Sequence, residues 1–152
     1  MKIGEKGLSL IKKFEGLRLK AYQDSVGIWT IGYGTIKYPD GVCVKEGDTC
    51  TEEQAEEYLI HHINEKITVK LNEFLDRNKI VLTQPQIDAL YSFSYNLGLG
   101  PITVGGKSLN MALLSGNKDS ITKAILLYDK AGGKVLEGLK RRRQAESALF
   151  LS

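Results

Sequence analysis

Hydrophobic and polar residues follow different spacings along the chain, and each spacing predicts a kind of element. Apolar residues at Leu8, Ile11 and Phe14 recur at helical spacing and predict a short first helix. Gly16 stands where a glycine commonly ends a helix. Between residues 17 and 38, β-forming residues are punctuated by glycines, which is typical of a small antiparallel sheet.

The remainder of the chain carries the start and stop signals of successive helices. Thr51 followed by Gln54 is a capping-box signature, and the helix after it runs on or restarts through Leu71, Phe74 and Leu75. The signals of the later helices are Thr83 with Pro85, a helix over 109–114, a cap at Asn117 or Ser120, a break at Gly132-Gly133, and a last helix over 139–151. The expected order is helix, small sheet, long helix and several further helices.

This segregation of strands from helices predicts an α+β fold rather than a doubly wound sheet. We expect one domain, with a small β-containing lobe at about residues 15–60. The first helix and residues 61–152 are expected to form a larger helical lobe. A cleft between two such lobes is a favoured place for a site.

Composition narrows the class of protein. The chain has 152 residues, 42% of them hydrophobic and 26% charged, which is close to a globular average. Its net charge of +3 mildly favours an anionic partner without requiring nucleic acid. No apolar run is long enough for a spanning helix or a signal peptide, so we expect the chain to stay in the cytoplasm where it is made.

Several residues that can bind metals or nucleic acid have simpler interpretations. Cys43 and Cys50 lack the neighbours of a zinc site, and either one disulfide or two reduced thiols fits them. His61 and His62 are adjacent, so on a helix they point to different faces. The four successive basic residues at 140–143 cover every face of a helix, and at least one is expected to pack inward. We therefore expect no metal, no organic cofactor and no nucleic-acid partner.

The residues with the clearest chemistry are Glu15, Asp24 and Thr30. One carboxyl group is expected at a helix end, the second just before a turn of the sheet, and the hydroxyl on the following strand. Because the intervening chain can fold back, all three can face one cleft.

This pattern and its surroundings resemble the phage-type lysozymes, glycoside hydrolase family 24, across nearly the whole chain. The resemblance rests on the spacing of the three residues and on the segments that contain and follow them: Glu15-Gly16-Leu17-Arg18-Leu19, Ala21-Tyr22, Trp29-Thr30-Ile31-Gly32-Tyr33-Gly34, Leu82-Thr83-Gln84, Asp88-Ala89-Leu90 and Arg141-Arg142-Arg143. It implies a lysozyme-like fold.

The resemblance also implies an endolysin that cleaves the β-1,4 bond between N-acetylmuramic acid and N-acetylglucosamine in bacterial peptidoglycan. Glu15 is then the general acid, Asp24 directs or activates water, and Thr30 holds that water. Inversion of configuration is expected, with carboxyl groups roughly 6.5–9.5 Å apart. The resemblance further implies substrate contacts at Ile36 and Ser108, and an arginine, Arg142, that reaches back toward Glu15.

The same resemblance implies a monomer made in the host bacterial cytoplasm, with no stable membrane insertion, that depends on a separate holin for release to the cell wall. Three competing interpretations remain open. They are a lytic transglycosylase, a non-catalytic wall-binding protein, and a cationic protein that kills through its last helix.

Overall fold

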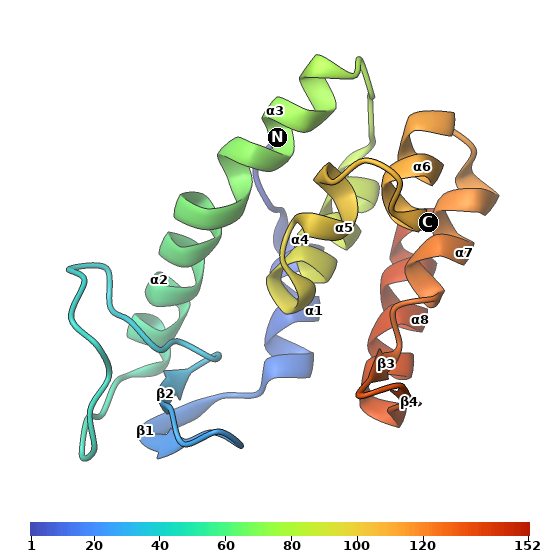
Figure 1. Ribbon diagram of the computed structural model, residues 1–152. Helices are drawn as coiled ribbons and strands as arrows, with labels where there is room; N and C mark the ends of the chain where they lie inside the picture. The colour runs from blue at the N-terminus through green and yellow to red at the C-terminus, as the bar shows by residue number, and fades with distance from the viewer. The chain divides into compact units, whose positions relative to one another are not determined.

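The computed structural model describes residues 1–152, which form two compact units (Figure 1). One unit is Ile11–Lys66, and the other joins Met1–Leu10 to Ile67–Ser152. Helices predominate, and the strands form two separate two-stranded antiparallel sheets. The predicted α+β fold is confirmed.

The unit Ile11–Lys66 is built from a hairpin that packs on a helix (Figure 1). Strand β1 (Arg18–Gln23) pairs with β2 (Trp29–Gly32), and β2 lies against α2 (Glu52–Ile63). At Gly32 a Cβ atom would meet the Ala55 Cβ at 3.1 Å, and the backbone has a φ of +66°. Glycine at this position therefore allows the sheet to approach the helix closely.

The helix α2 begins at the predicted capping box. The Thr51 hydroxyl accepts from the Gln54 N–H at 3.1 Å, and the Gln54 side chain accepts from the Thr51 N–H at 3.0 Å. After α2 the chain remains helical through a π-helical segment, η1 (Asn64–Thr68), and then through α3 (Val69–Arg77). The long helical pattern therefore runs on rather than restarting.

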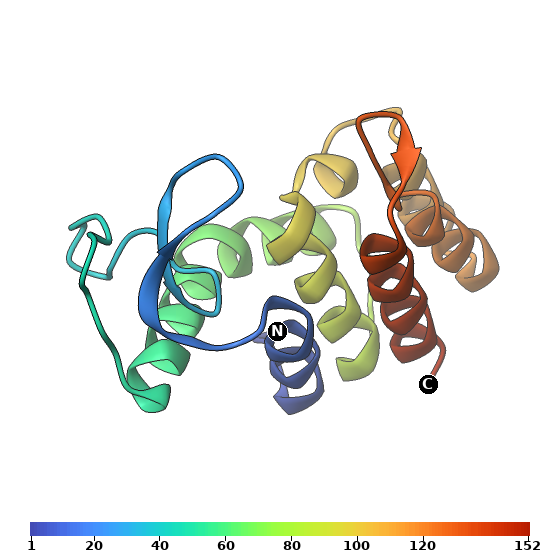
Figure 2. The same cartoon turned by 90° about the horizontal axis from the view of Figure 1, so that it is seen from below.

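In the second unit, α8 (Glu137–Leu151) packs against both α4 (Gln84–Leu97) and α7 (Lys118–Leu126), as Figure 2 shows. Helix α4 buries nine consecutive residues, 86–94, which makes it the centre of this unit. The short helices α5 (Gly100–Thr103) and α6 (Ser108–Ser115) connect α4 to α7.

The start of α1 (Glu5–Glu15) is attached to α4 through Asp88. The Asp88 carboxylate accepts from the N–H of Gly4 at 2.8 Å and from the N–H of Gly7 at 3.1 Å. These are among the N–H groups that a helix start leaves without partners. A Cβ at Gly7 would lie 3.0 Å from the Asp88 Cβ, so glycine permits this contact.

The helix ends largely follow the predicted signals. Gly16 and Gly116 have φ values of +73° and +71° and end α1 and α6. Thr83 caps α4, again with a capping box. Of the two proposed caps for α7, Asn117 is the one used, because its side chain accepts from the Ser120 N–H at 2.9 Å.

One expectation is wrong: strands are not confined to the early part of the chain. Strands β3 (Lys130–Ala131) and β4 (Lys134–Val135) form a second hairpin, and Gly132-Gly133 is its turn rather than only a helix break. Both glycines have positive φ, as a tight two-residue hairpin turn requires. Two-residue strands are too short to produce a recognisable alternation of polar and apolar residues.

The structure also describes the two cysteines and the apolar character of the helices. Cys43 and Cys50 are free thiols in this structure, the first exposed and the second buried. None of the helices combines the length and the apolar character needed to cross a membrane.

Candidate active site

Glu15 is the last residue of α1, and the chain turns into the sheet directly after it. Gly16 closes the helix by donating its N–H to the Lys12 carbonyl at 3.0 Å, in a left-handed conformation that glycine adopts without strain. Only Leu17 then separates it from strand β1. The Glu15 side chain is half-buried.

Lys12, one turn before Glu15, holds this end of α1 in place. Its Nζ lies 2.5 Å from the Glu56 carboxylate on α2 and 5.6 Å from the centre of the Tyr33 ring. The ammonium group thus makes both an ion pair and a cation–π contact within the unit Ile11–Lys66. Through Lys12, Glu56 on α2 and Tyr33 after β2 hold the last turn of α1 in place. This turn carries the backbone of Glu15.

Asp24 lies in the turn between β1 and β2, and one of its carboxylate oxygens is occupied by the turn. Oδ1 accepts from the N–H of Val26 at 2.9 Å and from that of Ile28 at 2.8 Å. The Asp24 N–H donates to the Ile28 carbonyl at 2.9 Å, and Gly27 completes the turn with a φ of +84°. Oδ2 accepts no hydrogen bond from the protein, so it is available to a ligand.

Thr30 lies on β2 opposite Tyr22 and is only 4% exposed. Its hydroxyl donates to the Ile28 carbonyl at 3.0 Å. Because that bond uses the only hydroxyl proton, the lone pairs of Oγ1 remain to accept a hydrogen bond from a water molecule. Asp24 and Thr30 are both held through Ile28.

All three residues, Glu15, Asp24 and Thr30, belong to the unit Ile11–Lys66. Glu15 comes from its helix, Asp24 from its turn and Thr30 from its second strand. Ile36 belongs to the same unit, in the loop after β2, where it is 49% exposed.

The loop after β2 is closed by a hydrogen-bonded pair. The Tyr38 hydroxyl donates to Asp48 Oδ2 at 2.7 Å, and the Lys45 N–H donates to the same oxygen at 3.0 Å. These two bonds lower the pKa of Asp48, and burial beside that carboxylate raises the pKa of Tyr38. Tyr38 also contacts Tyr58 edge to face at 5.1 Å, which attaches the loop to α2.

Ser108 and Arg142 belong to the other unit. Ser108 is the exposed first residue of α6. Arg142 is 4% exposed, and it donates to the Ser92 carbonyl at 3.1 Å and contacts Glu146 at 3.4 Å. The side chain of Arg142 is thus held by its own unit.

Arg142 belongs to a buried charge cluster that joins α8 to α4. Glu146 Oε2 accepts from the Ser92 hydroxyl at 2.6 Å, and Glu146 Oε1 lies 2.7 Å from Arg143 Nε. Arg143 also donates to Asn96 at 2.9 Å. Burial raises the pKa of Glu146, and the two guanidinium groups and the Ser92 hydroxyl oppose that rise. Of the basic run 140–143, two residues therefore pack inward, Arg142 and Arg143, and the other two are not buried.

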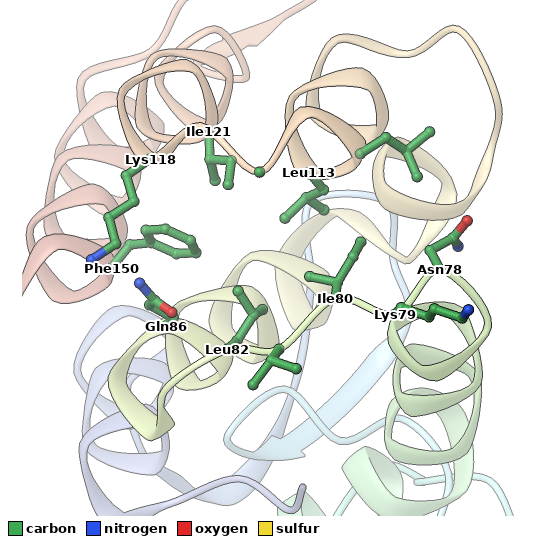
Figure 3. Close-up of a pocket in the computed structure, with 12 residues that line it drawn as sticks. Asn78, Lys79, Ile80, Leu82, Gln86, Leu113, Lys118, Ile121 and Phe150 are labelled. Atoms are coloured by element: carbon green, nitrogen blue, oxygen red, sulfur yellow. The ribbon is translucent and has the colours of Figure 1, made fainter.

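A cavity of about 270 Å³ in the helical unit is a poor candidate for acid–base chemistry. Figure 3 shows apolar side chains that point into it, among them Ile80, Leu113 and Phe150. Its lining contains no aspartate or glutamate, so it lacks a group that can protonate a leaving oxygen.

One exposed feature of the hairpin has no counterpart among the residues predicted from sequence. The Arg18 guanidinium lies over the Tyr22 ring, 4.2 Å from its centre. The signal available in the sequence was an arginine and a tyrosine four residues apart on a predicted strand, but a bulge between them determines which neighbours meet. That bulge is not encoded in a recognisable motif.

Comparison with known proteins identifies the class. Residues 12–146 match the family model described as phage lysozyme. An endolysin of Acyrthosiphon pisum secondary endosymbiont phage 1 is 44% identical over 156 residues, covering 100% of this chain and 99% of that protein. An endolysin of Bacillus phage B103 is 39% identical, and this chain spans 55% of its length.

Solved structures give the same result. An endolysin from Escherichia coli O157:H7 phage FAHEc1 superimposes with a TM-score of 0.85 at 38% identity, covering 100% of this chain and 94% of that one. The fold is therefore that of the phage lysozymes. This chain belongs to the phage lysozyme family, and its class is that of the cell-wall hydrolases.

Proposed function

We propose that this protein is an endolysin that hydrolyses the β-1,4 bond between N-acetylmuramic acid and N-acetylglucosamine in peptidoglycan. The observation that carries the proposal is the pair of acceptors on the hairpin. Asp24 Oδ2 accepts no hydrogen bond from the protein, and the Thr30 hydroxyl donates its hydrogen bond to the Ile28 carbonyl, so that Oγ1 can act as an acceptor. Together they suit a water molecule that must lose a proton.

In the proposed reaction Glu15 donates its proton to the glycosidic oxygen as the bond from that oxygen to the anomeric carbon breaks. The water oxygen forms a new bond to that carbon, and the water gives up one proton to Asp24. Thr30 accepts a hydrogen bond from the other water proton and so directs a lone pair of the water oxygen toward the anomeric carbon. The product with inverted configuration follows if water attacks the face opposite the leaving oxygen.

Three further residues have proposed roles, two in binding the glycan and one at Glu15. Ile36 offers an exposed apolar surface in the catalytic unit. Ser108 presents an exposed hydroxyl at the start of α6. Arg142, held by Ser92 and Glu146, is proposed to act on Glu15. The whole chain then works as one lysozyme domain.

The proposed setting is a phage infection. The protein is made as a monomer in the bacterial cytoplasm and reaches the wall after a separate holin opens the membrane. No metal or organic cofactor takes part in the proposed steps.

The mass of the soluble products tests the reaction type. Purified peptidoglycan is digested, and the released fragments are analysed by mass spectrometry. Each cleavage should add one water. Fragments that lack this water and end in an anhydro sugar would indicate a lytic transglycosylase instead.

A turbidity assay on bacteria stripped of their outer membrane tests whether lysis requires catalysis at all. The wild type should clear the suspension within minutes, and Glu15→Gln should not. Binding without clearing would indicate a non-catalytic wall-binding protein. Clearing that persists in Glu15→Gln would indicate membrane damage by the last helix.

A further inference from the structure

The hairpin that carries Asp24 and Thr30 also presents a cation prepared to bind an anion. The Arg18 side chain is exposed and forms neither an ion pair nor a hydrogen bond within the protein. Its guanidinium nevertheless has a neighbour within the protein, because it lies over the Tyr22 ring at 4.2 Å from the centre. A guanidinium over an aromatic ring makes a cation–π contact, and its N–H groups can still bind a carboxylate in a bidentate manner.

The strand register places this pair beside Thr30, one of the proposed catalytic residues. Tyr22 is the direct antiparallel partner of Thr30. Directly opposed residues of an antiparallel pair share one face of the sheet, with Cβ atoms about 4.5–5.5 Å apart. Because Arg18 lies over the Tyr22 ring, it belongs to the same face as Thr30.

The chemistry of the proposed substrate supplies an anion at this place. In peptidoglycan every second sugar carries a short peptide with free carboxylates, so a strand bound at Thr30 brings a carboxylate close to the scissile bond. We propose that Arg18, held by Tyr22, binds a carboxylate of this stem peptide and thereby favours peptide-bearing glycan over bare glycan. This inference rests on the proposed function, because it assumes that the glycan lies along this face of the hairpin.

Kinetics on two forms of one substrate test the inference. Purified glycan strands are prepared with their stem peptides and, in a second portion, with the peptides removed by an amidase. Arg18→Gln should raise KM on peptide-bearing strands about tenfold, the size expected for a lost charge-assisted hydrogen bond. On peptide-free strands KM should change less than about twofold, and kcat should stay unchanged on both.

Two related variants separate charge from stacking. Arg18→Lys keeps the charge but loses the planar guanidinium, and Tyr22→Leu keeps an apolar neighbour but loses the ring. Both should give an intermediate KM on peptide-bearing strands. Lys45→Gln removes an exposed positive charge elsewhere in the same unit and should behave as the wild type on both substrates.

The outcomes distinguish this inference from the proposed function. A wild type that releases no reducing ends from either substrate contradicts the proposed function and the inference with it. An active wild type with an Arg18→Gln variant that changes KM equally on both substrates, or on neither, contradicts the inference alone. Equilibrium binding of the same strands to the Glu15→Gln protein gives the same comparison without turnover.

Discussion

The hydroxyl of Thr30 is oriented by a hydrogen bond within the protein. Its proton is committed to the Ile28 carbonyl at 3.0 Å, so the oxygen faces any water as an acceptor only. Thr30→Val removes the acceptor while keeping the shape of the side chain, and it should lower kcat about tenfold, the worth of one well-placed hydrogen bond. Thr30→Ser keeps the hydroxyl and should retain most of the activity. Equal rates in the two variants, at equal melting temperatures, would rule out this role.

Asp48 predicts a dependence of stability on pH. The Lys45 N–H and the Tyr38 hydroxyl lower its pKa in the folded protein, whereas an unfolded aspartate has a pKa of about 3.9. Its stabilising contribution is therefore complete above about pH 3.9 and is lost as the pH falls through the lower, folded value. Asp48→Asn should lower the free energy of unfolding at pH 7 and approach the wild type in acid, as followed by urea titration.

A matched control is Asp76→Asn, because that side chain is exposed and forms no hydrogen bond or ion pair within the protein. Its difference from the wild type should not shrink over the same acid range. A constant difference for Asp48→Asn would contradict the account of this pair.

At the scale of elements, short-range signals predicted the structure well. The caps at Thr51 and Thr83 and the glycine stops at Gly16 and Gly116 depend on a few neighbouring residues, so the sequence contains all the information they need. The helix α5 and the hairpin β3–β4 were missed, because their periodicity covers too few residues.

In the candidate site, too, some features could be predicted from the sequence and others could not. Glu15, Asp24 and Thr30 were predicted as site residues from their spacing and from the family resemblance, and all three belong to the unit Ile11–Lys66. The hydrogen bonds that leave Asp24 Oδ2 available come from backbone N–H groups, which nearly every residue has, so no residue type marks them. The stacking of Arg18 on Tyr22 depends on a bulge and could not be predicted either.

The end of α3 offers a test of backbone strain. Lys79 is the only residue other than glycine with a positive φ, +55°, in the turn that follows the helix. Its N–H donates to the Asp76 carbonyl at 3.1 Å, and the Ile80 N–H donates to the Leu75 carbonyl at 2.9 Å, a helix end that normally uses glycine. Lys79→Gly should raise the free energy of unfolding by about 0.5–1 kcal/mol, since relief of strain exceeds the added entropy of the unfolded chain.

Lys79→Ala is the control for that substitution, because it removes the same charge but keeps a Cβ atom. In urea unfolding it should gain little or nothing. A gain in Lys79→Ala equal to that in Lys79→Gly would assign the effect to the lysine side chain rather than to the backbone.

At the scale of the whole molecule, a buried charge cluster joins α8 to α4. Glu146 is fully buried, forms ion pairs with Arg142 and Arg143, and accepts a hydrogen bond from Ser92. Glu146→Ala leaves two guanidinium groups buried without their carboxylate and should lower the free energy of unfolding by about 3–5 kcal/mol. Gln144→Ala, at an exposed position of the same helix, should change it by less than about 0.5 kcal/mol. Similar small losses in both variants would show that the cluster is not the stabilising contact inferred here.

The central claim is that one carboxyl group supplies a proton and another prepares a water molecule. The most direct test is the rate at which Glu15→Gln and Asp24→Asn release reducing ends from purified peptidoglycan, each compared with the wild type at equal melting temperature. Both substitutions keep the size of the side chain and remove its acid–base chemistry, so both rates should fall by at least about a hundredfold. Rates equal to that of the wild type in both variants would contradict the account.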